Sequence, residues 1–253
     1  MSEGEVRGPV LVEACVDSVE SALAAEAGGA RRIELCDNLV EGGTTPSAAT
    51  IAVACERLGI PVFVIVRPRG GDFLYSDLEL EVMRRDIEQA KALGASGVVI
   101  GVLRADGTVD IERARPLVEA ARPLGVTHHR AFDVTRDPAE ALEAIIELGA
   151  DRVLTSGQAP TALEGIGVIA AAVRQAAGRI GILPGAGIDG ANARRIVEAT
   201  GVQEIHVRGT SVRSSAMQYR NPRIDFGGRL TAADELVEVT DAGLIREIVV
   251  AVG

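Results

Sequence analysis

Two short stretches of the sequence place a carboxylate two residues before a thiol. Glu13 and Cys15 lie in VEACVDS, and Glu34 and Cys36 lie in RIELCDN. Residues two apart on a β-strand point to the same side, so each stretch holds its acid and its thiol together. A carboxylate beside a thiol disfavours the thiolate, unless a metal ion or a cation such as Arg67 compensates for it. The repeated pattern therefore predicts two acids and two thiols on one wall of a pocket.

Inert packing is the alternative interpretation of these cysteines. Cys is among the most buried residue types and often behaves as a small apolar side chain. Cys55, in the helical pattern IAVACERLG, is expected to be of this kind. Cys15 and Cys36 differ from Cys55 because each follows a Glu by two residues near the end of an apolar, strand-like run.

The elements that position these residues repeat eight times along the chain. A glycine closes a helix-like stretch and an apolar, β-rich run follows at once; Gly29 and Gly149 are examples, because glycine adopts the left-handed conformation that ends many helices. The expected strands are residues 10–16, 30–36, 60–66, 95–102, 126–132, 150–156, 179–184 and 202–207.

Helical periodicity fills the intervals between these runs. One stripe, formed by Leu78, Val82, Ile87, Ala90 and Leu93, indicates a helix before the fourth strand. Asp137 and Pro138 are typical of a helix start, and residues 240–252 predict a last helix. Strands that alternate with helices form parallel sheets, and eight such units in 253 residues predict a single α/β domain, a (β/α)8 TIM barrel over residues 1–253. A doubly wound sheet is the alternative, but no G-x-G-x-x-G follows the first strand. Residues 207–235 are expected to form an irregular long loop.

Further polar residues fall at the carboxyl ends of the expected strands, where TIM barrels carry their chemistry. Arg67, His129 and His206 are candidates that would face the mouth with Glu34. Arg67 would pair with a carboxylate such as Glu34 or bind an anion. Glu34 or His129 could act as a general base. His128 alternates with His129 and is expected to pack outward.

Glycine-rich turns follow the last two strands, where many barrels bind phosphate through backbone N–H groups. Gly185, Gly187, Gly209 and Thr210 are the candidate anion ligands, although Asp189 would repel a phosphate.

Composition narrows the class of protein. The net charge of −10 and the pI of about 4.9 argue against a nucleic-acid partner. Residues 1–9 do not resemble a signal peptide, and no apolar run approaches the about 20 residues of a membrane helix. We therefore expect a cytoplasmic protein with reduced thiols and no membrane partner. Whether the chain forms a homo-oligomer stays open.

The residues around these sites resemble the copper-homeostasis family CutC. The resemblance runs from residue 11 to about residue 222 and is carried by EACVDSVESALAAEAGGARRIELCDNLVEGGTTPS, IPVFVIVRPRGGDFLYSDLE, VTHHRAFDVTRDP, DRVLTSGQAPTALEG and MQYRN. It implies a (β/α)8 barrel, a cytoplasmic protein linked to copper handling, and a Cu(I) site at Cys15 and Cys36. The chain departs from the family in having His128, where Phe is common, and Arg208, where small residues follow the last histidine.

Two functional hypotheses follow. The first is a copper-homeostasis protein that binds Cu(I) through Cys15 and Cys36 at the carboxyl-terminal mouth of the barrel, since Cu(I) prefers soft thiolates. The second is a TIM-barrel enzyme acting on a small anionic or phosphorylated metabolite, in which Arg67 and the last two strand-to-helix turns hold the anion. The sequence leaves open whether the protein is an enzyme.

Overall fold

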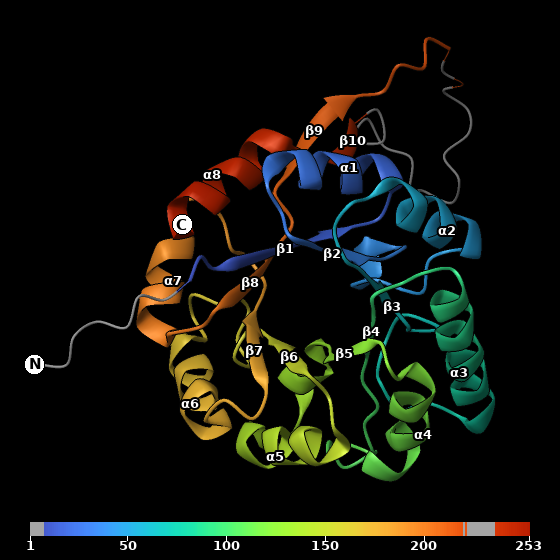
Figure 1. The fold of residues 1–253 in the computed structure, drawn as a ribbon, viewed down its shortest axis with the longest axis vertical. Helices are drawn as coiled ribbons and strands as arrows, with labels where there is room; N and C mark the ends of the chain where they lie inside the picture. The colour runs from blue at the N-terminus through green and yellow to red at the C-terminus, as the bar shows by residue number, and fades with distance from the viewer. Residues whose placement is uncertain (1–7, 220, 222–235) are drawn as a thin grey trace, which may run out of the picture.

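Eight parallel strands curve into a barrel with helices around it (Figure 1). The structure is a computed structural model that describes residues 8–219, 221 and 236–253. The barrel strands are β1 (Leu11–Val16), β2 (Arg32–Leu35), β3 (Val62–Ile65), β4 (Gly97–Ile100), β5 (Gly125–His128), β6 (Arg152–Thr155), β7 (Gly181–Pro184) and β8 (Glu204–Val207). Each overlaps a run expected from the sequence, which confirms the predicted (β/α)8 barrel.

The helices between the strands pack on the outside of the sheet. They are α1 (Val19–Gly28), α2 (Ala48–Arg57), α3 (Asp77–Ala92), α4 (Ile111–Ala121), α5 (Pro138–Leu148), α6 (Ile166–Ala176), α7 (Ala193–Thr200) and α8 (Ala242–Val252), with 3-10 turns η1 (Leu39–Glu41) and η2 (Arg130–Val134). None of the helices in the described part of the chain is long and apolar enough to cross a membrane.

The start predicted for α5 is confirmed, whereas the buried face of α3 differs from the predicted stripe. Asp137 caps α5 by accepting hydrogen bonds from two backbone N–H groups, and Pro138 is its first residue. In α3, however, Leu78 and Val82 are exposed, and the buried stripe includes Met83 instead. The capping box between Ser76 and Glu79 marks where α3 begins, and the exposed Leu78 is the second residue of the helix.

The register of the first strands aligns the chemistry across neighbours. Cys15 on β1 is paired with Glu34 on β2, and Glu13 is paired with Arg32 on one side and with His206 of β8 on the other. The strand order is β7-β6-β5-β4-β3-β2-β1-β8, so β7 and β8 are its two ends. Each strand is hydrogen-bonded to its neighbours in this order. Among the described strands, no backbone ladder joins β7 directly to β8.

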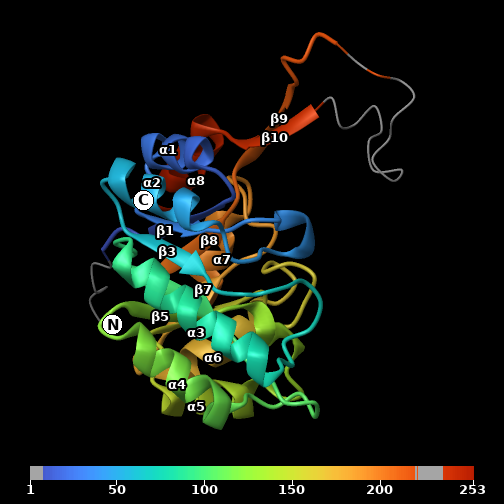
Figure 2. The same cartoon turned by 90° about the vertical axis from the view of Figure 1, so that its right-hand side faces the viewer.

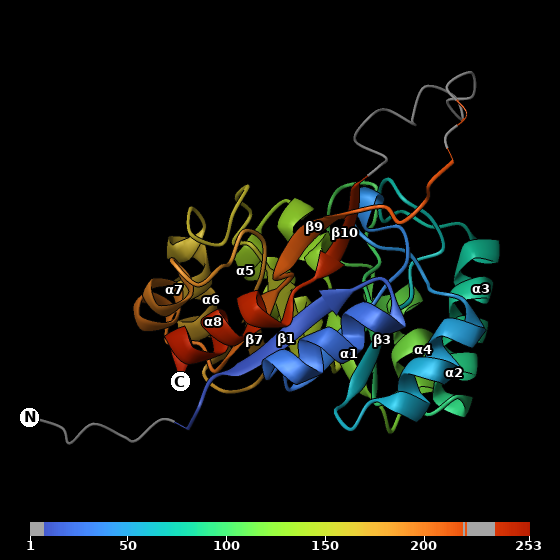
Figure 3. The same cartoon turned by 90° about the horizontal axis from the view of Figure 1, so that it is seen from above.

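One strand occupies part of the stretch expected to be an irregular loop, and its partner strand begins just after that stretch. Strand β9 (Thr210–Ser214) pairs antiparallel with β10 (Leu236–Thr240), and the pair projects away from the barrel (Figures 2 and 3). The sequence stretch 207–235 is therefore not entirely irregular. Residues 220 and 222–235 of that stretch lie outside the described part of the chain. The single-domain organisation over residues 1–253 stays a prediction.

One aromatic side chain fills the lower part of the barrel. Phe63 of β3 lies over the bare backbones of Gly97 and Gly125 on the next two strands, where an added Cβ would come within 2.3 and 2.8 Å of its ring. The guanidinium groups of Arg32 and Arg152 lie 5.2 and 5.0 Å from the centre of that ring. This layer forms the floor on which the polar residues of the barrel mouth rest.

Candidate functional site

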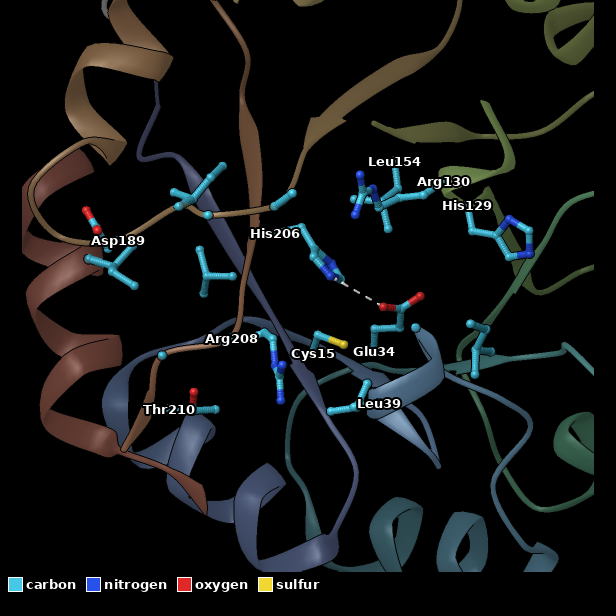
Figure 4. A pocket seen from close by; sticks show the side chains of 18 of the residues that line it. Cys15, Glu34, Leu39, His129, Arg130, Leu154, Asp189, His206, Arg208 and Thr210 are labelled. Carbon is cyan, nitrogen blue, oxygen red and sulfur yellow. Dashed lines mark ion pairs between the residues drawn. The ribbon is translucent and has the colours of Figure 1, made fainter. Parts of the chain in front are cut away.

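A cavity of about 900 Å³ opens at the carboxyl ends of the strands (Figure 4). It extends from the barrel axis sideways, between the loops that follow β7 and β8, to one face of α8. The predicted site residues on its wall are Cys15, Glu34, Arg67, His129, Gly187, His206, Gly209 and Thr210. Gly185 is not on the wall, because its backbone packs against Leu154 and His206.

The two thiols predicted to face each other do so. The Sγ atoms of Cys15 and Cys36 are 3.8 Å apart and both side chains are buried. Cys15 borders the cavity, whereas Cys36 lies behind it, under the loop at Gly43. One carboxylate oxygen of Glu34 lies within 4.8 Å of both sulfur atoms. These three residues are the group in the described chain whose ligand atoms converge closely enough to hold a metal ion.

The protonation of this group is unequal between its members. The contact between the two thiols lowers the pKa of Cys15 well below its usual value and raises the pKa of Cys36. Burial also raises the pKa of Cys36. Burial raises the pKa of Glu34 well above its usual value, and the charge of Cys15 raises it further. Cys15 is therefore the thiol that loses its proton first, and Glu34 is the carboxyl group that holds one longest.

His206 joins the thiol group to the barrel interior. Its Nδ1 is 2.7 Å from Glu13 Oε1, and its Nε2 is 3.5 Å from Glu34 Oε2 (Figure 4 shows the second contact). Burial acts to lower the pKa of His206, but the charge of Glu34 and hydrogen bonds with Cys15 and Glu13 outweigh it and raise the pKa well above the usual value. His206 thus lies between two acids and a thiol, which favour its protonated form.

Glu13 lies deeper than the sequence suggested. We expected it at the mouth with Glu34, but it is not on the cavity wall and forms an ion pair with Arg32. Despite burial, the hydrogen bond from His206 and the charge of Arg32 lower the pKa of Glu13 to about 2. Because it sits two residues before Cys15 on the strand, Glu13 shares the inward face but occupies the layer below.

The sequence interpretation missed the charged residues of this lower layer. Arg32 binds Glu13 and also Glu204, with its Nη2 2.7 Å from Glu204 Oε2, and Arg152 reaches the same Glu204 at 3.2 Å. Alternation could have found them: Arg32 is two residues before Glu34, and Glu204 is two before His206. A charged residue at the start of a strand usually lies at a solvent-exposed end. That tendency alone favours a solvent-exposed position for Arg32 and Glu204 over the barrel interior.

Arg67 has different partners from those expected. Its guanidinium donates to the backbone carbonyls of Glu41, Gly43 and Gly71 at 2.7–2.8 Å, rather than to a carboxylate such as Glu34. Its guanidinium carbon also lies 5.1 Å from the centre of the Phe73 ring. Arg67 therefore ties together the loops that follow β2 and β3 while forming part of the cavity wall.

Of the two histidines at the end of β5, His129 borders the cavity and His128 does not. His128 is buried, and its Nδ1 is 3.1 Å from the carbonyl oxygen of His129. His129 accepts a hydrogen bond from the Ala131 N–H on Nδ1, at 3.2 Å. Burial, with His128 and Arg67 nearby, holds the pKa of His129 well below its usual range. The neutral ring then carries its proton on Nε2, which suits it to donate a hydrogen bond rather than to act as a general base.

The loops after β7 and β8 form the side arm of the cavity. Gly187 and Gly209 both have a positive φ, and their backbones border the cavity with Thr210. Asp189 also borders it, and its carboxylate accepts hydrogen bonds from the N–H groups of Ala191 and Asn192. Arg208 also borders the cavity and pairs with Glu238 at 3.2 Å. This end of the cavity thus carries charges of both signs.

Comparisons with known proteins give the chain its family. The CutC family model matches residues 10–211. The human protein named copper homeostasis protein cutC homolog is 50% identical over 238 residues, which cover 94% of this chain and 87% of the human protein. A CutC protein from Mesorhizobium japonicum is 48% identical and covers 98% of this chain and 95% of its own length.

Solved structures agree with this assignment. The crystal structure of CutC from Streptococcus agalactiae matches with a TM-score of 0.75 and 36% identity, over 78% of this chain and 98% of that one. Phosphoribosyl anthranilate isomerase from Thermococcus kodakaraensis matches with a TM-score of 0.61 but only 17% identity, over 96% and 98% of the two chains. That second likeness shows the fold alone. With a family model over most of its length and relatives at about half identity, this chain belongs to the CutC family.

Proposed function

We propose that this protein takes part in copper homeostasis in the cytoplasm by binding Cu(I) between the thiols of Cys15 and Cys36. The observation that carries the proposal is the 3.8 Å separation of the two Sγ atoms beside an open cavity. Cu(I) prefers soft sulfur ligands and tolerates few of them, so the two thiols can suffice. Free thiols also fit a reducing compartment, where they would stay available to the metal.

The surroundings of the pair fit a site of modest affinity. Cys15 loses its proton readily, but Cys36 has a raised pKa and must also deprotonate to bind as a thiolate. Protonated His206, which its raised pKa favours, would offset part of the negative charge that two thiolates bring. We therefore expect binding to weaken as the pH falls, because protons compete with Cu(I) for both sulfur atoms.

A competition titration against a chromogenic Cu(I) chelator tests the proposal under reducing conditions. The wild-type protein and Cys55→Ser should each bind about one Cu(I) per chain, because Cys55 lies on α2 away from the cavity. The double variant Cys15→Ser/Cys36→Ser should lose this binding. Undiminished binding by the double variant would remove the copper site from this wall of the barrel.

The size of the cavity favours a second candidate function. About 900 Å³ is far more than one metal ion needs and is typical of a pocket for a small organic ligand. An enzyme acting on a small anionic or phosphorylated metabolite would use Arg67 with the backbone at Gly187, Gly209 and Thr210 to hold the anion, and Glu34 as the group that exchanges a proton. The mixed charge at the side arm, with Asp189 on its wall, is less favourable to phosphate.

Calorimetry with inorganic phosphate as the probe tests this second candidate. Arg67→Lys keeps the charge but cannot reach three carbonyl groups, so it should weaken phosphate binding about tenfold. Arg104→Ala, which changes an arginine outside the cavity wall, should bind as the wild type does. Equal affinity in all three proteins, or no binding by any, would count against an anion site at this mouth.

A further inference from the structure

We propose that Cys15 and Cys36 form a dithiol that reduces hydroperoxides and closes to a disulfide within one chain. The inference goes beyond copper binding and does not depend on it, since it needs only the two sulfur atoms and the cavity. In this chemistry Cys15 is the thiol that attacks the peroxide and Cys36 is the thiol that resolves the product.

The positions of the two sulfur atoms set these roles. Cys15 borders the cavity, so a small molecule can reach its Sγ. Cys36 is nearly fully buried, does not border the cavity, and is covered by the loop at Gly43, where an added Cβ would lie 3.2 Å from its Sγ. A peroxide in the cavity would therefore meet Cys15 first, and Cys36 would be the next sulfur available to it.

The pair can close without breaking the barrel. The two Sγ atoms must approach from 3.8 Å to the about 2 Å of a disulfide bond. Cys15 belongs to the β1 ladder, but Cys36 is the first residue after β2. Its backbone N–H donates to the Val16 carbonyl at 2.8 Å, and the chain then turns into the loop that contains Gly43. The movement needed for closure can fall on this loop rather than on the sheet.

The reaction is balanced by the peroxide alone. The thiolate of Cys15 attacks one peroxide oxygen, so that an S–O bond forms, the O–O bond breaks, and the leaving oxygen takes a proton to become an alcohol. The sulfur of Cys36 then attacks the sulfenic acid on Cys15; the S–S bond forms and the S–O bond breaks, with loss of water. Two thiols and one hydroperoxide thus give one disulfide, one alcohol and one water, and the two thiol protons end on those products.

The cavity wall indicates which peroxides can enter. Leu39, Ile65, Phe73 and Leu154 contribute apolar side chains to it. An uncharged alkyl hydroperoxide can place its carbon chain against these side chains and its O–O group at Cys15. Hydrogen peroxide is small enough to reach the same sulfur.

Mass spectrometry of metal-free protein tests the proposal, with Cys55→Ser as the background so that two thiols remain. After treatment with tert-butyl hydroperoxide or hydrogen peroxide, the intact mass should fall by the two hydrogens lost, and digestion should yield a peptide joining Cys15 to Cys36. The Cys36→Ser variant on this background should instead form a sulfenic acid on Cys15 that dimedone traps. The Cys15→Ser variant should react at least tenfold more slowly, because its remaining thiol lies behind the cavity wall.

Circular dichroism and thermal melting establish that each variant is folded, and glutathione treated in parallel confirms that the oxidant is active. Three outcomes would overturn the proposal: both thiols remaining free while glutathione is oxidised, disulfides only between chains, or equal rates for the two single-thiol variants. The copper proposal and the dithiol proposal can be tested independently. A disulfide form that still bound one Cu(I) would refute the copper site while leaving the dithiol chemistry intact.

Discussion

At the scale of single residues, the barrel gives two buried glutamates opposite properties. Glu13 is held ionised by Arg32 and His206, whereas Glu34, one strand away, has a raised pKa because burial dominates and the charge of Cys15 adds to it. The same residue type is thus ionised in the lower layer, as Glu13, and favours its protonated form in the upper layer, as Glu34. Environment rather than residue type sets the chemistry.

The lowered pKa of Glu13 predicts a pH-dependent stability. A folded-state pKa of about 2, below the unfolded value of 4.5, means that the ionised Glu13 stabilises the fold above pH 4.5 and that this contribution is lost as the pH falls towards 2. The difference corresponds to on the order of 3 kcal/mol. Glu13→Gln should therefore lower the free energy of unfolding by about 3–5 kcal/mol at pH 7, because Arg32 and His206 lose their partner.

Urea denaturation at several pH values measures this effect. The variant should also show a flatter dependence on pH between 4.5 and 2 than the wild type does. Glu143→Gln is the matched control, since Glu143 forms a solvent-exposed pair with Arg179 and its loss should leave the urea midpoint nearly unchanged. Similar midpoints for Glu13→Gln and Glu143→Gln would show that the buried network contributes little.

Side-chain direction could be predicted from the sequence, but side-chain partners across loops could not. Alternation along a strand placed Cys15 and Cys36 on the inward face, and the 3.8 Å contact bears this out. Arg67 was expected to pair with a carboxylate such as Glu34 or to bind an anion. Its described partners are instead backbone carbonyls of two loops, and anion binding stays a prediction. Its partners depend on the path that those loops take, and no local pattern in the sequence encodes that path.

At the scale of elements, the interior of the barrel depends on small residues beside a large one. The ring of Phe63 on β3 lies over Gly97 on β4, its neighbour in register, and two arginines stack on it. The floor therefore needs glycine at a position where strands otherwise favour branched residues. This floor helps to position the polar layer above it, because Arg32 stacks on Phe63 and forms an ion pair with Glu13.

Gly97→Ala should destabilise the barrel by about 2 kcal/mol or more, because the new methyl group would overlap the Phe63 ring and force the strands apart. Gly167→Ala is the matched control: Gly167 is in α6, has no atom within 4 Å of an added Cβ, and should gain about 0.5–1 kcal/mol of stability. Thermal melting and urea titration measure both changes. A neutral Gly97→Ala would mean that Phe63 can move freely aside.

Elements with strong periodicity were predictable, and those that depend on tertiary contacts were less so. The eight strands followed from their apolar runs, and α5 from Asp137 and Pro138. Strand β9 was missed because its residues, TSVRS, are too short and polar to show a pattern by themselves. It is a strand because β10 lies against it, from a position more than twenty residues along the chain.

At the scale of the whole molecule, the barrel has one junction of a different kind. Strand β7 is paired with β6 and β8 with β1, and the ladder stops at these two strands within the described barrel. Backbone groups on the facing edges of β7 and β8 therefore lack the ladder that protects the other strands. We refer to this junction between residues 181–184 and 204–207 as the β7–β8 seam.

Hydrogen exchange should show the β7–β8 seam as the least protected part of the barrel. About half of the amide groups in β7 and β8 should exchange faster than those of β3 and β4, each of which is paired on both sides. Mass spectrometry of peptic peptides gives the comparison directly. Uniform protection around all eight strands would show that β7 and β8 are held together as firmly as their neighbours.

The position of the large cavity gives this seam a practical meaning. Residues on both sides of it, from Ala186 to Ala191 and from Val207 to Thr210, form the cavity's side arm. A molecule bound there would contact the loops after both β7 and β8, the two described barrel strands that are not joined by a backbone ladder. Its binding energy would add to the stability of the closed barrel. Slower exchange at the seam would therefore reveal a ligand of any chemical class, even one whose identity is still open. A cell extract could be fractionated by its power to slow exchange in β7 and β8, and the protein itself would report what it binds.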